Sequence, residues 1–116
     1  MTTRPDPLAF VRAAALAVLE TAHAYPTVQD GTTFPSIVYY GVSNIGLTTF
    51  GVTADRATAV RIEVRAKQFA KTVELEQKIV RRLREGGRLR ALLALIDEYD
   101  DDLNVYHRTR TVMIKQ

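Results

Sequence analysis

The stretch Val-Arg-Ile-Glu-Val-Arg-Ala-Lys at residues 60–67 carries the clearest structural signal in the chain. Apolar side chains alternate with charged ones, which is the period of a β-strand with one face in the core and the other in a polar environment. The outer face of this predicted strand carries Arg61, Glu63 and Arg65. Glu63 stands between the two arginines, so we expect these charges to pair locally.

The segments before and after this strand predict two helices. Asp6 is a candidate N-cap and Pro7 suits the first helical position, and the apolar spacing that follows predicts a helix as far as Thr21-Ala22. A second apolar stripe predicts a helix over residues 71–85. Its last turn holds Arg81, Arg82 and Arg84, where cations suit the helix dipole, and Gly86-Gly87 predict a left-handed end.

Two further strands and one ambiguous segment complete the chain. Residues 36–42 and 104–115 are rich in β-branched and aromatic side chains and predict strands, the first of them interior because it is apolar on both faces. Residues 88–99 fit both a helix and a buried strand, and their periodicity alone favours the helix. If the polar turn at 99–104 closes a hairpin, however, residues 89–98 must be a strand.

Residues 43–57 predict a long hairpin arm or a mobile loop that carries apolar side chains. An isolated monomer has little reason to expose such residues, whereas an assembly contact would bury them. The candidates for this contact are Ile45, Leu47 and Phe50.

Composition and charge narrow the classes of function. A chain of 116 residues fits one domain, 1–116. Its net charge of +3 conceals a basic middle, because eleven of the 16 lysines and arginines but only four of the 13 acidic residues lie in residues 56–95. Such a segment suits a solvated surface, an acidic protein partner or nucleic acid.

The chain offers little for catalysis. It has no cysteine and two histidines, His23 and His107, and no apolar run near the roughly 20 residues that span a bilayer. The aspartates at 97 and 100–102 lack the spacing of a calcium loop, and Gly86-Gly87 do not form a phosphate loop. We therefore expect no enzyme, no metal, no cofactor and no membrane partner.

The order of several short stretches resembles that of a known family. These are Ala-Tyr-Pro-Thr-Val at 24–28, Asp-Gly-Thr-Thr-Phe-Pro-Ser-Ile-Val-Tyr at 30–39, Arg-Ile-Glu-Val-Arg-Ala at 61–66, and Ile-Asp-Glu-Tyr-Asp-Asp-Asp-Leu-Asn-Val-Tyr-His-Arg at 96–108. Together they resemble the small tail-completion, or tail-terminator, proteins of long-tailed phages, prophages and gene transfer agents.

The resemblance implies a fold and a function. The implied fold is α+β, with an antiparallel sheet of about four strands, two helices packed on one face, a strand at 89–98 and an extended loop or hairpin arm at 43–57. The implied function is that of a virion protein, assembled in the bacterial host cytoplasm, that caps the head-proximal end of the tail tube as a hexameric ring. Its partners would be itself, the tail tube protein and a head-tail connector or stopper protein, while DNA only passes through the lumen.

Three groups of residues are candidate assembly contacts in this interpretation. The apolar arm would meet the tube or a neighbouring subunit, Arg61, Glu63 and Arg65 would form ion pairs between subunits, and Arg81, Arg82 and Arg84 would face a protein partner. Two alternatives remain open, namely a small α+β ligand-binding or regulatory oligomeric domain, and a basic nucleic-acid-binding module.

Overall fold

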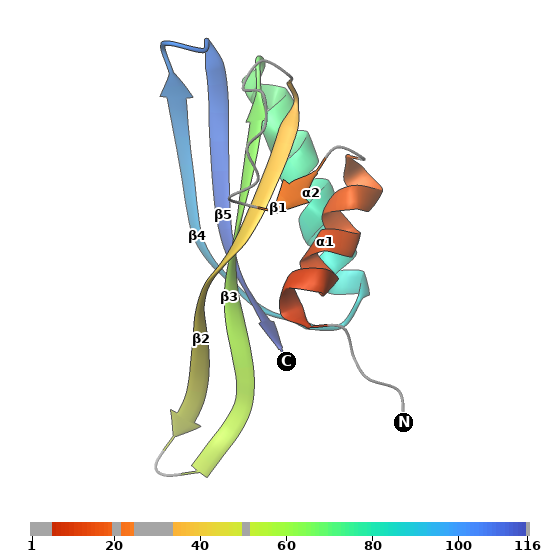
Figure 1. The fold of residues 1–116 in the computed structure, drawn as a ribbon, viewed down its shortest axis with the longest axis vertical. Coiled ribbons are helices and arrows are strands. Elements are labelled where there is room, and N and C mark those ends of the chain that lie inside the picture. The colour runs from red at the N-terminus through yellow and green to blue at the C-terminus, as the bar shows by residue number, and fades with distance from the viewer. Residues whose placement is uncertain (1–5, 20–21, 25–33, 50–51, 116) are drawn as a thin grey trace.

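Two helices lie on one face of a sheet in which four long strands run antiparallel (Figure 1). The computed structural model describes residues 6–19, 22–24, 34–49 and 52–115, with the backbone alone for residues 23–24, 43–49 and 52–56. In chain order the elements are α1 (Pro7–Val18), β1 (His23–Ala24), β2 (Ser36–Thr49), β3 (Val52–Ala66), α2 (Phe69–Glu85), β4 (Leu89–Asp100) and β5 (Val105–Lys115).

The strand order is β1-β2-β3-β5-β4, so β4 forms one edge of the sheet. The short β1 pairs in parallel with Val38 and Tyr39 of β2, and the other neighbouring pairs are antiparallel. This confirms the expected α+β fold with two helices on one side. It adds β1, which the sequence did not predict.

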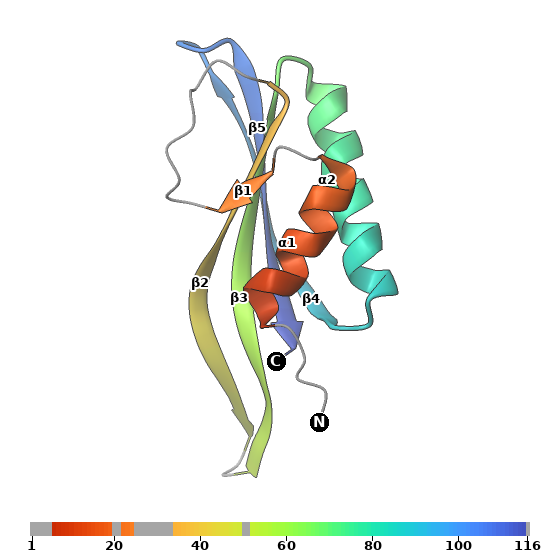
Figure 2. The ribbon, with the colours of Figure 1, turned by 45° about the vertical axis from the view of Figure 1, so that its right-hand side comes forward.

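Residues 43–49 and 52–57 form a hairpin arm and not a loop. They continue β2 and β3, which pair from Ser36↔Arg65 to Thr49↔Val52 with irregularities after Gly41 and Gly46. The distal part of this arm extends past the ends of both helices (Figure 2). The first of the two expected alternatives for this segment is therefore correct.

The helical periodicity of residues 88–99 is misleading, because the segment is strand β4. Its backbone pairs with β5 from Leu89↔Ile114 to Asp100↔Val105. The turn that follows is held by the Asp100 carboxylate, which accepts the backbone N–H groups of Asp102 and Leu103. Backbone pairing with the next strand thus outweighs the helical spacing of the apolar residues in this segment.

The helix ends differ in detail from the expectation. Helix α1 ends at Val18 and not at Thr21-Ala22, since Leu19 has extended backbone angles and its N–H closes the last turn on Ala15. At the end of α2, only Gly87 has positive φ, whereas Gly86 is right-handed. Gly86 instead makes room for a neighbour, because a Cβ there would clash with the Phe10 ring of α1.

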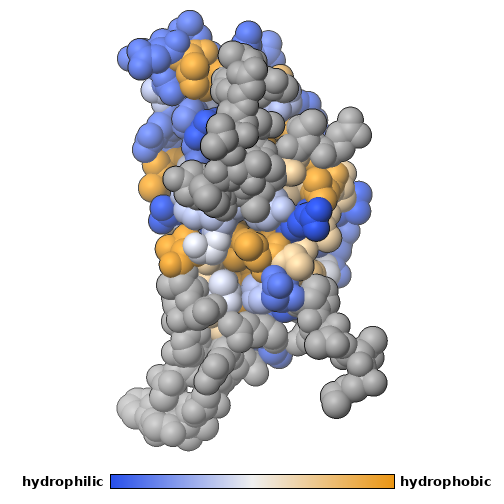
Figure 3. Space-filling view, in the orientation of Figure 1, coloured by the Kyte–Doolittle hydropathy of each residue, from blue (hydrophilic) through white to orange (hydrophobic). Residues whose placement is uncertain are grey.

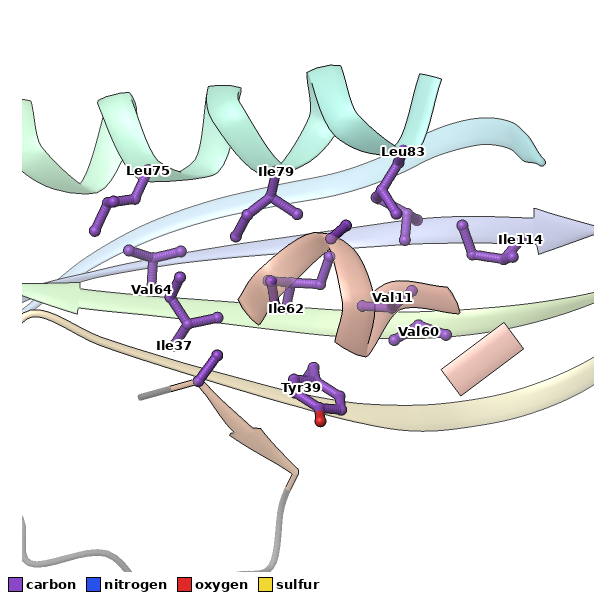
Figure 4. Close-up of a cluster of buried hydrophobic side chains, with 14 residues drawn as sticks. Val11, Ile37, Tyr39, Val60, Ile62, Val64, Leu75, Ile79, Leu83 and Ile114 are labelled. Carbon is purple, nitrogen blue, oxygen red and sulfur yellow. The ribbon is translucent and has the colours of Figure 1, made fainter. Parts of the chain in front are cut away.

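The core lies between the helices and the middle of the sheet (Figure 4). On β3 the buried residues alternate as the sequence predicts, and Val60, Ile62 and Val64 all face the helices. Helix α2 contributes Leu75, Ile79 and Leu83, which are fully or almost fully buried. The alternation at 60–67 therefore identifies the face of the sheet that the helices cover.

Truncating a core residue of α2 tests this packing. We expect Ile79→Ala to lower the free energy of unfolding by about 2–5 kcal/mol, because the lost methyl groups leave a cavity against the sheet. The matched control Gln77→Ala, on the exposed side of the same helix, should stay within about 0.5 kcal/mol of wild type. Urea denaturation measures both, and equal effects of the two variants would contradict the assigned helix orientation.

A buried phenol gives a dependence of stability on pH. Burial raises the pKa of Tyr39 above its usual value, and the nearby Arg12 opposes this only in part. The contribution of Tyr39 to stability is therefore full below about pH 10 and is lost as the pH rises through its folded-state pKa. Between about pH 9 and pH 11, wild type should lose more stability in urea denaturation than Tyr39→Phe, and parallel losses would refute this.

Candidate assembly surfaces

The face of the sheet opposite the helices holds a charged cluster around Glu63. Arg65 donates from Nε to the Glu63 Oε1 atom at 3.1 Å, and His107 Nδ1 lies 3.1 Å from the same oxygen. The other ring nitrogen of His107 lies 3.8 Å from Asp100 Oδ2, too far for a hydrogen bond. The predicted local pairing of Glu63 is thus confirmed for Arg65.

Arg61 does not join this cluster. Its guanidinium lies 5.8 Å from the centre of the Tyr40 ring and 3.5 Å from the Tyr40 hydroxyl. Of the three residues expected to pair between subunits, Glu63 and Arg65 already pair with each other inside one subunit. Their proposed role between subunits stays a prediction.

The helix-covered face contains a second charged network, which the sequence interpretation missed. Glu76 of α2 is only 3% exposed, and its Oε1 accepts a 2.7 Å hydrogen bond from Arg110 Nε. Arg108 Nε lies 3.8 Å from the other oxygen of Glu76, and Arg108 Nη1 donates to Asp97 of β4 at 3.0 Å. A carboxylate buried to this extent requires such cationic partners.

Two sequence signals could have revealed this network. Glu76 falls within the buried stripe of α2, next to Leu75 and three residues before Ile79. Arg108 and Arg110 occupy the same alternating positions of β5 as the buried Val112 and Ile114. Acidic and basic residues at core-facing positions of two elements predict a buried ion pair.

The arginines predicted as contacts on α2 border two hollows. One hollow of about 340 Å³ lies between α2 and the sheet and is lined by Glu76, Gln77, Val80, Arg81, Arg84, Leu92, Arg108 and Arg110. The other, of about 450 Å³, is lined by Ala17, Val18, Lys78, Arg81, Arg82 and Glu85. Arg81, Arg82 and Arg84 are exposed, and no described residue forms an ion pair with them.

Strand β4 presents apolar side chains at the edge of the sheet. Leu93, Ile96 and Tyr99 are 47%, 51% and 48% exposed. Hydrophobic patches interrupt the hydrophilic surface on the side where β4 lies (Figure 3). An edge strand with exposed apolar residues is typical of a contact surface, because open edges otherwise invite unwanted pairing.

The predicted contacts on the arm are described only in part. Ile45 and Leu47 belong to the part of β2 (residues 43–49) in which the structure describes the backbone alone, and Phe50 lies outside the described residues. Within the described part of the chain, no three His, Cys, Asp or Glu residues come together as metal ligands. In the same part, the helices are too short or too polar to span a membrane.

One solved structure is similar to this chain along nearly its whole length. It is a chain in the virion of a native gene transfer agent particle, with a TM-score of 0.67 and 12% sequence identity. The match covers 94% of this chain and 92% of the other chain. No family model and no curated protein matches the sequence. At this level of identity, the similarity establishes a shared fold.

Removal of the buried carboxylate tests the second network. Glu76→Ala should lower the free energy of unfolding by about 3–5 kcal/mol, because it leaves Arg108 and Arg110 without their buried counter-charge. The control Glu74→Ala removes an exposed carboxylate that pairs with Lys71 and Lys78 on the same helix, and should lower the free energy of unfolding far less, because water screens exposed ion pairs. Chemical denaturation at neutral pH compares the two, and a loss for Glu76→Ala no larger than for Glu74→Ala would contradict the assigned role.

Proposed function

We propose that this chain is a structural virion protein that forms a ring on the head-proximal end of a tail tube, ends tube polymerisation and joins the tail to the head connector. The observation that carries the proposal is the fold, which matches a chain of a gene transfer agent virion from one end to the other. The family resemblance of residues 24–39, 61–66 and 96–108 supports the same role.

The distribution of surfaces supports a ring. Subunits of a cyclic ring meet through heterologous contacts, so each copy needs two different patches that fit each other. This chain has apolar residues along the β4 edge, exposed arginines on α2 that form no ion pair with any described residue, and an arm that projects beyond the helices. Three distinct surfaces are enough for two neighbours and for an axial partner such as the tube.

The hollows favour protein contacts over a small ligand. Small-molecule sites are enclosed and mostly apolar, with a few convergent polar groups. Here charged side chains form most of the lining of both hollows, and long arginines border each. The ligand-binding alternative would gain support from a stable dimer that binds a metabolite.

Capping of isolated tail tubes tests the proposed function. Wild-type protein should appear by negative-stain electron microscopy at one end of each tube and stop further growth of tubes from tube protein. Phe50→Asp in the arm should abolish capping, because a carboxylate opposes burial of an apolar contact. Uncapped tubes with the wild-type protein would overturn the proposal.

A matched control separates loss of contact from loss of fold. Ala13→Asp introduces the same carboxylate on the exposed side of α1 and should cap tubes normally. Circular dichroism of both variants should match wild type. An unfolded Phe50→Asp would show that the arm belongs to the core, and normal capping by it would exclude Phe50 as a contact.

The nucleic-acid alternative makes a different prediction. A channel that must release DNA should not hold it tightly, so we expect no measurable affinity for duplex DNA near physiological salt. A titration with labelled DNA at several salt concentrations measures this. Strong binding that weakens steeply with salt would favour the nucleic-acid-binding module.

A further inference from the structure

We infer that the acidic turn between β4 and β5 of one copy docks into the arginine-lined hollow of the next copy. The acidic turn is residues 100–103, and the arginine hollow is the 340 Å³ space bordered by Arg81, Arg84, Arg108 and Arg110. The inference rests on the proposed ring, since it identifies the two patches through which neighbouring copies meet.

Hydrogen bonds hold the shape of the acidic turn, and two of its carboxylates are exposed. Asp100 accepts the N–H groups of Asp102 and Leu103 at 2.9 and 3.1 Å, and the Tyr99 hydroxyl donates to Asn104 across the turn. The carboxylates of Asp101 and Asp102 are exposed, and no described residue bonds to them. A turn already fixed in shape loses little entropy when it binds.

The arginine hollow has an excess of positive charge. Arg110 is paired with Glu76, and Arg108 with Asp97, whereas Arg81 and Arg84 have no ion pair among the described residues. Arg108 Nε is also buried, and no described residue accepts a hydrogen bond from it. Guanidinium groups recognise carboxylates through paired hydrogen bonds, so this hollow suits acidic side chains.

Apolar residues accompany the charges on both sides. Leu103 on the acidic turn is 40% exposed, and the hollow is lined by Val80 and Leu92 as well as by arginines. Docking would place Leu103 against these side chains and would remove apolar area from water. Both charge and hydropathy of the two patches are therefore complementary.

The turn cannot enter the hollow of its own copy. Leu92 in the hollow and Asp101 in the turn are nine residues apart, about 30 Å at about 3.3 Å per strand residue. Arg108, the lining residue nearest the turn, pairs with Asp97, about 10 Å along the hairpin from Asp100. The turn lies at the end of the sheet away from the C-terminal end of α2 (Figures 1 and 2). The contact must join two copies head to tail, which is the arrangement that generates a ring.

Charge reversal on each patch tests the inference in the absence of tubes. We make Arg81→Glu/Arg84→Glu in the hollow and Asp101→Lys/Asp102→Lys in the turn, and follow self-association by sedimentation velocity at micromolar concentration. Each variant alone should associate at least about 30-fold more weakly than wild type. An equimolar mixture should recover assemblies of wild-type size. The acidic turn of the first variant fits the basic hollow of the second, and the lysine turn of the second fits the hollow of the first, which now carries two glutamates.

A matched control addresses non-specific charge effects. Lys67→Glu/Lys78→Glu reverses two exposed charges that do not line the arginine hollow, and should associate like wild type. Circular dichroism must show that all variants are folded. Normal association of either reversed variant, or no recovery in the mixture of two folded variants, would overturn the inference.

Cross-linking detects the contact even where association is weak. The chain has no cysteine, so we add Gln77→Cys in the hollow and Asp102→Cys in the turn and treat the protein with a short bis-maleimide. The double variant should give a ladder beyond the dimer, whereas Gln77→Cys alone should stop at the dimer. No ladder from the double variant, in solution or on tail tubes, would overturn the inference.

The outcomes separate this inference from the proposed function. A ladder and recovery by mixing, together with uncapped tubes, would support the contact between copies and refute the capping role. Capped tubes without a ladder would support the capping role and refute the contact between copies. DNA affinity that is lost in Arg81→Glu/Arg84→Glu alone would assign the hollow to nucleic acid and overturn the inference.

Discussion

Two helices cover a sheet that is longer than they are, and the other features of the molecule depend on this mismatch. Helix α2 has 17 residues and is about 26 Å long, whereas β3 has 15 residues and reaches about 50 Å, since a strand rises more than twice as far per residue. The core therefore occupies the middle of the sheet. The arm of β2 and β3 and the apolar edge of β4 lie beyond it, where the helices do not cover the sheet.

Glu76 stands where the covered part of the sheet ends. Toward α1, the side chains between α2 and the sheet are aliphatic, and toward β4 they become arginines. By pairing with Arg110 and lying close to Arg108, Glu76 allows α2 to approach β5 although two cations face it. The same carboxylate thus closes the core and orients two guanidinium groups along the adjoining hollow.

The net charge of +3 hides how positive and negative side chains are distributed over the surface of the molecule. On β3, Arg65 is neutralised by Glu63, and Arg61 lies over a tyrosine ring. On α2, Arg81, Arg82 and Arg84 are exposed and form no ion pair with any described residue. The aspartates of the acidic turn, which could neutralise their charge, lie at the opposite end of β4. Separated patches of opposite sign favour head-to-tail association of identical copies, which agrees with the proposed ring.

The sequence by itself determined the elements whose residues repeat with one clear period. The alternation at 60–67 predicted the strand and its buried face, and Asp6-Pro7 predicted the start of α1. The tertiary structure alone decided residues 88–99, because their apolar run satisfies both periods until β5 supplies backbone partners. It alone also brought Glu76 to Arg110, 34 residues later in the chain. Local periodicity reports which face of an element is apolar, whereas an ion pair or a strand pairing depends on which distant residues the fold brings within bonding distance.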